Sequence, residues 1–154
     1  MITIRDYVES DAAVLWDIFY NTIRRINSRD YSQAEVESWA SDEQDPVLWE
    51  KRMKGICPFI AEIKGVAVGY ADLQASGLID HFFCHHNYQR QGVGTALMEH
   101  IFSVGETKGI ERYYSKVSKT AKPFYERFGF SVVTEQTLDS GEQMLENFTM
   151  EKIS

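Results

Sequence analysis

Apolar and polar residues recur along this chain with two different periods, and each period predicts one type of element. Segments that alternate apolar with polar residues, or are short and rich in β-branched and aromatic ones, predict strands at residues 2–8, 59–63, 66–73, 78–84, 112–117, 132–136 and 145–152. Segments with apolar side chains every three or four positions predict helices at residues 11–26, 32–39, 45–53, 92–108 and 119–129. The dipeptides Lys64-Gly65 and Ser140-Gly141 supply the turns of two predicted hairpins.

The order of these elements predicts the topology. Three consecutive strands between residues 59 and 84 are joined by short turns, which favours an antiparallel meander. A helix separates the strand at residues 78–84 from the strand at residues 112–117, so these two strands are predicted to be parallel. We therefore expect an α/β (α+β) fold with a mixed, mostly antiparallel sheet flanked by helices.

The composition is that of a globular protein. With 154 residues, of which 44% are hydrophobic and 13% aromatic, the chain can bury a sizeable core, and we expect one domain over residues 1–154. Cys57 and Cys84 lie in apolar surroundings, which indicates reduced, buried thiols. The first residues lack a signal-peptide pattern and no apolar run reaches membrane-spanning length, so we expect a cytoplasmic protein without a membrane partner.

The net charge of −7 disfavours non-specific binding of nucleic acid, and no nucleic-acid partner is expected. The charge is nevertheless uneven. From Lys108 to Arg127 there are six basic and two acidic residues, a net charge of +4, which leaves −11 for the remainder. A basic patch on an acidic protein suits a small polyanionic cofactor beside a site for cationic acceptors, and it equally suits a solvated, charged surface.

The start of the helix at residues 92–108 is unfavourable unless an anion binds there. Gly92 and Gly94 fall in its first turn, where each costs about 1 kcal/mol relative to alanine. No Ser, Thr, Asp or Asn immediately precedes the turn to cap its free N–H groups, and Arg90 adds a positive charge at the positive end of the helix dipole. A phosphate bound here would accept hydrogen bonds from these N–H groups and pair with Arg90. The alternative is a tight strand-to-helix turn that merely needs glycine.

Two motifs in this region resemble the signatures of the GNAT acetyltransferases. Gln89-Arg-Gln-Gly-Val-Gly94 is similar to the Gln/Arg-x-x-Gly-x-Gly/Ala loop of that family, with Gln91 where the family usually has Arg. Residues 119–130 resemble the motif Ala-x-x-Phe/Leu-Tyr-Glu-Lys/Arg-x-Gly-Phe, matched by Ala121, Tyr125, Glu126, Arg127, Gly129 and Phe130. Ser118 stands where the family often has Asn, and residues 29–40 look like the same region of its YafP-like subgroup.

The resemblance implies a fold and a cofactor. In GNAT proteins the backbone amides of the loop bind the pyrophosphate of acetyl-coenzyme A, here as a co-substrate. The sheet has six to seven strands, and its central parallel pair splays around the cofactor, which leaves N–H groups near Phe83 and Cys84 for the acetyl carbonyl and the pantetheine arm. The cofactor-binding residues implied by the resemblance are Phe82, Phe83, Cys84, Gln89, Arg90, Gln91, Gly92, Val93, Gly94, Thr95, Ser118 and Tyr125.

Acetylation of an amine by a thioester requires an acid for the departing thiolate and an acceptor for the amine proton. Tyr125 is the candidate acid, because its phenol is protonated at neutral pH and its position matches the family motif; the alternative is an ordinary core tyrosine. Asp80 is the candidate base, since an apolar setting near the cleft would raise the pKa of its carboxyl group. A strand-end hydrogen bond is an equally good interpretation of Asp80, water could take the proton instead, and Asp72 and Glu62 are weaker candidates.

The histidines of the central strand do not predict a metal site. His85 and His86 are adjacent, so on a strand they would face opposite sides, and no Cys or His pair has the spacing of structural zinc ligands. His81 could instead contact the acceptor. Cys84 is not expected to act as a nucleophile because a thiol buried in a strand is inert, so direct transfer in a ternary complex is the simpler hypothesis.

The sequence thus predicts an acetyl-coenzyme A-dependent N-acetyltransferase that acts on a primary amine of a small molecule, peptide or protein, without a metal. It does not identify the acceptor, and both a monomer and a homodimer are compatible with it. Two alternatives remain open at this point: a non-catalytic module that binds acyl-coenzyme A and regulates a partner, and a toxin that acetylates aminoacyl-tRNA.

Overall fold

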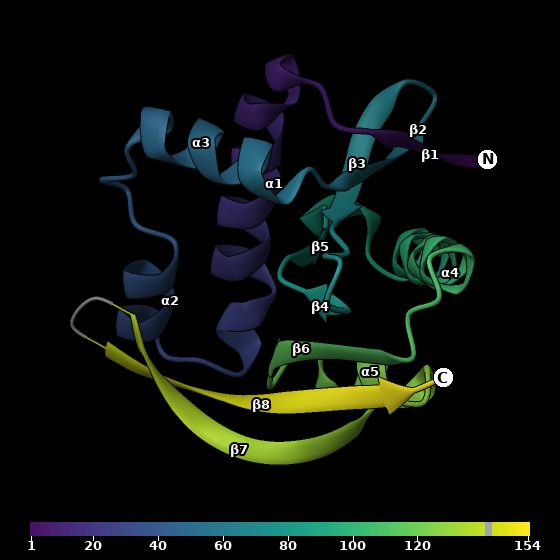
Figure 1. Cartoon of the computed structure of the whole chain (residues 1–154). Helices are drawn as coiled ribbons and strands as arrows, with labels where there is room; N and C mark the ends of the chain where they lie inside the picture. Colours follow the sequence, from purple (N-terminus) through teal and green to yellow (C-terminus); the bar gives the residue numbers. More distant parts are fainter. Residues whose placement is uncertain (141–142) are drawn as a thin grey trace.

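The structure, a computed structural model, describes residues 1–140 and 143–154 (Figure 1). Its α-helices are α1 (Ala12–Arg25), α2 (Gln33–Trp39), α3 (Pro46–Ile56), α4 (Val93–Thr107) and α5 (Lys122–Arg127). Short 3₁₀ turns are η1 (Glu9–Asp11), η2 (Asn27–Arg29) and η3 (His86–Tyr88). The strands are β1 (Ile2–Asp6), β2 (Phe59–Ile63), β3 (Val66–Ala71), β4 (Leu78–Ile79), β5 (Phe82–Cys84), β6 (Arg112–Ser118), β7 (Ser131–Ser140) and β8 (Gln143–Ile153).

In the described residues these strands form two four-stranded sheets. The first has the order β1-β2-β3-β5 and is antiparallel throughout. The second has the order β4-β6-β8-β7 and is antiparallel except for β4 and β6, which pair in parallel. The predicted mixed, mostly antiparallel α/β fold with one parallel pair is therefore confirmed.

One predicted strand is interrupted, and the interruption explains why two sheets form where one was expected. Between β4 and β5, the N–H groups of Asp80 and His81 donate to the carboxylate of Asp72, over 2.9 and 2.6 Å. Because these two amides bond to a side chain, they do not extend the pairing of β4 with β6, and the following strand β5 pairs with β3. The parallel strands therefore part at this point, as the resemblance to GNAT proteins implied.

Helices cover both faces of the first sheet. In Figure 1, α1, α2 and α3 lie on one side of β2 and β3, and α4 lies on the other side. Successive side chains of a strand point to opposite faces of the sheet, so alternate residues pack against the helices of one face or the other. Ile60 and Tyr70 pack with α1, α2 and α3, whereas Ala61 and Val68 pack with α4.

The sequence explains where the two short helices begin. At the start of α2, the N–H of Glu35 donates to the Ser32 hydroxyl over 3.1 Å, and the N–H of Ser32 donates to the Glu35 carboxylate over 2.7 Å. This reciprocal pair satisfies two N–H groups that the helix itself leaves free. At the start of α3, the Asp45 carboxylate accepts from the N–H of Val47, with proline in the first turn.

Two smaller expectations have different outcomes. Cys57 was expected to be buried, but it is exposed, because it ends α3 in a left-handed conformation (φ +49°) beyond the packed face of the helix. The turn predicted at Ser140-Gly141 lies partly outside the described residues, since β7 extends to Ser140 and Gly141 is not described. Among the described helices, none is long and apolar enough to cross a membrane.

Candidate active site

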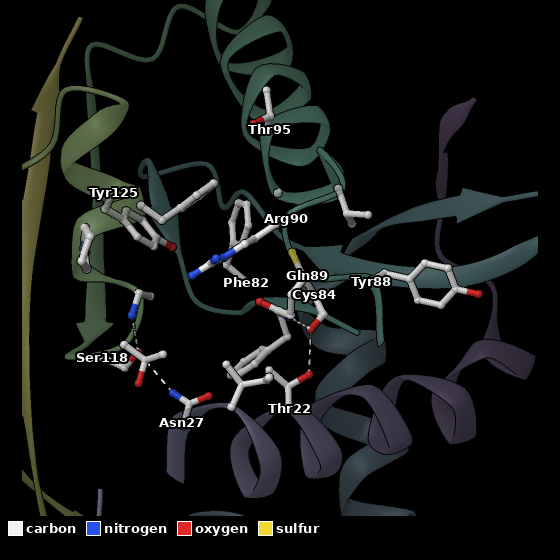
Figure 2. A pocket seen from close by; sticks show the side chains of 18 of the residues that line it. Thr22, Asn27, Phe82, Cys84, Tyr88, Gln89, Arg90, Thr95, Ser118 and Tyr125 are labelled. Atoms are coloured by element: carbon white, nitrogen blue, oxygen red, sulfur yellow. Dashed lines mark hydrogen bonds between the residues drawn. The ribbon is translucent and has the colours of Figure 1, made fainter. Parts of the chain in front are cut away.

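A pocket of about 410 Å³ lies where the two sheets part (Figure 2). Its walls come from α1 and η2, from β5 and the loop after it, from the first turn of α4, from the end of β6 and from α5. The pocket therefore has walls from helices on both faces of the first sheet. Of the predicted cofactor residues, all except Gln91 line it. Gln91 is exposed and its amide donates to the Asn87 carbonyl over 3.4 Å.

The N-terminus of α4 opens onto this pocket without a side-chain cap. Gly92 is the N-cap residue, with φ of +84°, and no side chain there bonds to the first turn of the helix. The first helical backbone bond runs from the N–H of Ala96 to the Gly92 carbonyl, so the N–H groups of residues 93–95 precede it. Val93, Gly94 and Thr95 all line the pocket. These N–H groups and the helix dipole are the features that the predicted anion site requires.

The two glycines of this turn are needed for different reasons. Gly92 adopts a left-handed backbone that other residues rarely adopt. A Cβ added to Gly94 would lie only 2.9 Å from Cε1 of Phe124, so glycine there allows α5 to pack closely against α4. Glycine is thus needed for the turn at Gly92 and for the helix packing at Gly94, as the alternative interpretation of this motif expected, while the approach of a ligand stays a prediction.

Three arginine side chains give the pocket a positive charge. Arg29, Arg90 and Arg127 line it, and Figure 2 shows the Arg90 side chain extending across it. Among the described residues, no Asp or Glu side chain contributes to the lining. The pocket is therefore suited to a polyanionic ligand, and one of its three arginines, Arg127, belongs to the basic stretch found in the sequence.

Strand β5 presents an open backbone edge. It has β3 as its one neighbour in the sheet, and the N–H of His85 donates to the Val68 carbonyl over 2.8 Å. In an antiparallel pair, hydrogen-bonded and non-hydrogen-bonded residues alternate along the strand. The N–H of Phe83 therefore faces β3 as well, whereas the N–H groups of Phe82 and Cys84 point away from β3. We expected the free N–H groups near Phe83 and Cys84; the register assigns them to Phe82 and Cys84.

Tyr125 lies at the inner wall of the pocket, as predicted. Its side chain is buried, and its hydroxyl oxygen lies 3.5 Å from the hydroxyl oxygen of Ser115. Burial raises the pKa of the Tyr125 phenol well above its usual value, while the hydrogen bond with Ser115 acts in the opposite direction. The phenol therefore keeps its proton at any physiological pH and can act as a donor.

The predicted bases lie outside the pocket. The Asp80 side chain is exposed, so the apolar setting expected around it is absent. Asp72 is the buried carboxylate of this region, and burial raises its pKa to about 6 even though three N–H donors oppose that shift. Glu62 forms an ion pair with Arg5 on β1 at 3.0 Å. The lining described above includes none of these three carboxylates.

The histidines and Cys84 do not form a metal or nucleophile site. His81 is buried beside Tyr70, and burial lowers its pKa to about 3, so its ring is neutral. His85 and His86 do not face opposite ways as expected; β5 ends before them, and their rings stack 4.5 Å apart. In the described parts of the chain, no three His, Cys, Asp or Glu side chains could together hold a metal ion. Burial raises the pKa of Cys84 to about 12, which leaves its thiol unreactive.

One wall of the pocket was not foreseen from the sequence. It comes from α1 and η2 and includes Thr22, Asn27 and Arg29. The Thr22 hydroxyl donates to the Cys84 carbonyl over 2.8 Å, and the Asn27 amide donates to the Ser118 hydroxyl over 3.4 Å (Figure 2). The available signal was Thr22 itself, a polar residue within the apolar stripe of its helix.

Comparison of the sequence and the structure with known proteins identifies acetyltransferases in each case. The profile of a family described as the acetyltransferase (GNAT) domain matches residues 27–153. The chain is 29% identical over 149 residues to the uncharacterized N-acetyltransferase YafP of Escherichia coli, covering 97% of this chain and 94% of that protein. An N-acetyltransferase from Rhodopseudomonas palustris has a similar structure, with a TM-score of 0.94 and 30% identity, covering 99% of this chain and 95% of that one. The PaiA N-acetyltransferase from Thermoplasma acidophilum, solved with coenzyme A, shares the fold at a TM-score of 0.75 and 19% identity, covering 100% and 99% of the two chains.

Proposed function

The chain belongs to the GNAT family of acetyltransferases, and from this premise we propose that it transfers the acetyl group of acetyl-coenzyme A to a primary amine. The observation that carries the proposal is the uncapped, glycine-containing start of α4, which presents free N–H groups to a pocket lined by arginines. Phosphate groups are among the anions that such a helix end binds, and the diphosphate of coenzyme A supplies them. The structure of the PaiA relative with coenzyme A supports the same choice of cofactor.

The pocket offers contacts for each part of the cofactor except its adenine. In this proposal the N–H groups at the start of α4, together with Arg90, hold the pyrophosphate. The N–H groups of Phe82 and Cys84 bind the pantetheine arm and the acetyl carbonyl along the free edge of β5. Gln89 acts on the loop itself, because its amide donates to the Cys84 carbonyl over 2.8 Å. We further propose that residues 1–154 act as one catalytic domain.

We propose Tyr125 as the general acid. Acetyl-coenzyme A supplies an activated acetyl group, whose transfer to an amine leaves a thiolate that must be protonated. The Tyr125 phenol is protonated and lines the pocket, as this task requires. Cys84 is a protonated thiol, which supports direct transfer to the amine without an acyl-enzyme intermediate.

For the amine proton we propose water as the acceptor. The described lining of the pocket offers no carboxylate, and the exposed position of Asp80 gives it no evident advantage over solvent. Asp80 remains the alternative base. An Asp80→Asn variant distinguishes the two, since loss of a general base typically lowers kcat by about a hundredfold or more.

The decisive experiment combines binding and turnover. Calorimetric titration of the folded protein with acetyl-coenzyme A should show saturable binding, and a panel of small amines and peptides should reveal an acceptor through the release of free thiol. If acetyl-coenzyme A binds but no amine yields a product, and if Tyr125→Phe leaves cofactor binding unchanged, the chain is a non-catalytic module. A salt-dependent complex with tRNA would indicate the toxin, against which the net charge of −7 argues. Absence of binding would refute the proposal.

A further inference from the structure

One peptide group at the parting of the two sheets is held from both sides. The Ile79–Asp80 peptide joins the end of β4 to the break before β5. Its N–H donates to the Asp72 carboxylate over 2.9 Å, and its carbonyl accepts a hydrogen bond from the Ser115 hydroxyl over 2.7 Å. The plane of this peptide is therefore fixed by one side chain from the end of β3 and one from β6.

Ser115 also reaches the proposed acid. On β6 it lies between Tyr113 and Val117 on the buried face of the strand. A hydroxyl buried there costs free energy unless it forms hydrogen bonds. Its hydroxyl carries one proton, and that proton is directed to the Ile79 carbonyl, which can only accept. In the contact with Tyr125, at 3.5 Å, the phenol must therefore be the donor and Ser115 the acceptor.

We propose that Ser115 is a positioning residue for Tyr125: anchored on the Ile79 carbonyl, its oxygen orients the phenol proton inside the pocket until the thiolate forms. This inference rests on the proposed function, because it assigns a partner to the acid of that reaction. The step it serves is a transfer of the phenol proton to the thiolate sulfur, which leaves a phenolate that Ser115 can stabilise by turning its own proton toward it.

The geometry suits a temporary contact. At 3.5 Å the two hydroxyl oxygens are farther apart than in an ordinary O–H···O hydrogen bond, so little is lost when the phenol proton leaves this contact. When the phenol has lost its proton, the Ser115 hydroxyl stabilises the phenolate and so lowers the pKa of Tyr125, whereas burial and the charges of Asp72 and Cys84 raise it. Removing the Ser115 hydroxyl should therefore make the phenol a weaker acid.

A double-mutant cycle tests this link. Ser115→Ala, Tyr125→Phe and the double variant are compared with the wild type, with the most reactive amine of the panel as acceptor and thiol release as the readout. Ser115→Ala alone should lower kcat about fivefold, the size expected for one neutral hydrogen bond, and should leave the KM for acetyl-coenzyme A nearly unchanged. In the Tyr125→Phe background, the same substitution should have no further effect on kcat.

The outcomes separate the inference from the proposed function. If the two losses in kcat multiply, Ser115 acts on the fold alone and the inference is wrong. If Tyr125→Phe leaves kcat unchanged, the acid itself is misassigned and the positioning role ends with it. Ser115→Thr keeps the hydroxyl and should restore most of the activity. Should Ser115→Ala not fold, Ser115→Cys, which preserves the size but weakens the donor, replaces it in the cycle.

A second readout needs no acceptor. With fluorotyrosine incorporated into the protein, the signal of position 125 in fluorine NMR can be assigned by its loss in Tyr125→Phe. Its chemical shift at neutral pH should differ between Ser115→Ala and the wild type, because the phenol proton has lost the oxygen that accepts it. An unchanged chemical shift in a folded variant would overturn the inference even if no amine is acetylated.

Discussion

Gly92→Ala can separate the two reasons for glycine at the start of α4. Gly92 has φ of +84°, in the left-handed region where a Cβ costs about 1–2 kcal/mol. Gly109, just beyond the other end of the same helix, has φ of +72° and serves as the matched control. Neither site is crowded, since an added Cβ on Gly92 would lie 3.8 Å from Cδ1 of Ile2 and one on Gly109 would meet nothing within 4 Å.

The two substitutions should destabilise the protein to the same extent but differ in binding. A loss of about 1–2 kcal/mol lowers the Tm of a chain of this size by about 2–8 °C. Only Gly92→Ala disturbs the N–H groups that face the pocket. One hydrogen bond to a charged phosphate contributes about 1.5–3 kcal/mol, and 1.4 kcal/mol is a factor of ten, so Gly92→Ala should weaken acetyl-coenzyme A binding about tenfold or more.

Thermal unfolding measures the first effect, and calorimetric titration well below both Tm values measures the second. Gly109→Ala should bind acetyl-coenzyme A with the wild-type Kd. If Gly92→Ala also keeps the wild-type Kd while its Tm falls, the glycine serves the turn alone. The start of α4 would then not be the phosphate site, and the main support for the proposed cofactor would be lost.

Four further substitutions test other parts of the site. Tyr125→Phe should lower kcat about a hundredfold with little change in the Kd of acetyl-coenzyme A; equal losses in both would show a binding role instead. Arg90→Gln should weaken cofactor binding and flatten its dependence on salt, because one charge pair is lost; an unchanged salt slope would place the arginine away from the phosphates. Asp80→Asn should change kcat less than about threefold if water takes the amine proton, and a loss of about a hundredfold would restore Asp80 as the base. The pKa of Asp72 is raised to about 6 from an unfolded value of about 3.9, so its ionisation opposes folding and stability falls as pH rises through that interval. Asp72→Asn should remove this fall, at most about 3 kcal/mol, in urea denaturation between pH 4 and 6; curves with the same pH dependence as the wild type would contradict the burial argument.

Much of the architecture could be predicted because it depends on short-range signals. The turn at Lys64-Gly65, the helix ended by Gly109 and the parallel relation of the strands around it follow from neighbouring residues and from connection rules. The uncapped start of α4 could be predicted for a related reason. Its N–H groups, glycines and Arg90 are adjacent in sequence, so the anomaly of an uncapped helix start is visible without a structure.

The proton-transfer residues could not be assigned in the same way, because burial depends on distant partners. Asp72 and Asp80 are both carboxylates within predicted strands, and nothing in the residues around them tells which would face solvent. The unforeseen wall of the pocket has the same origin: Thr22 reaches a carbonyl 62 residues away, and Asn27 reaches a hydroxyl 91 residues away. In the sequence, the most that indicates a long-range contact of this kind is a polar residue within the apolar stripe of a helix.

The buried carboxylate and the gap between the sheets have a common physical origin. Two strands that part must each give up hydrogen bonds, and unpaired buried N–H groups cost free energy. Asp72 accepts the N–H groups of Asp80 and His81 at the break, so the desolvation of its charge, seen in its raised pKa, is offset by donors that would otherwise be unpaired. An uncharged acceptor would avoid that desolvation but would bond the two amides more weakly, since hydrogen bonds to an ionised group are the stronger ones. We therefore expect the parting of the sheets, and with it the proposed site for the thioester, to depend more on this one side chain than on any residue that lines the pocket.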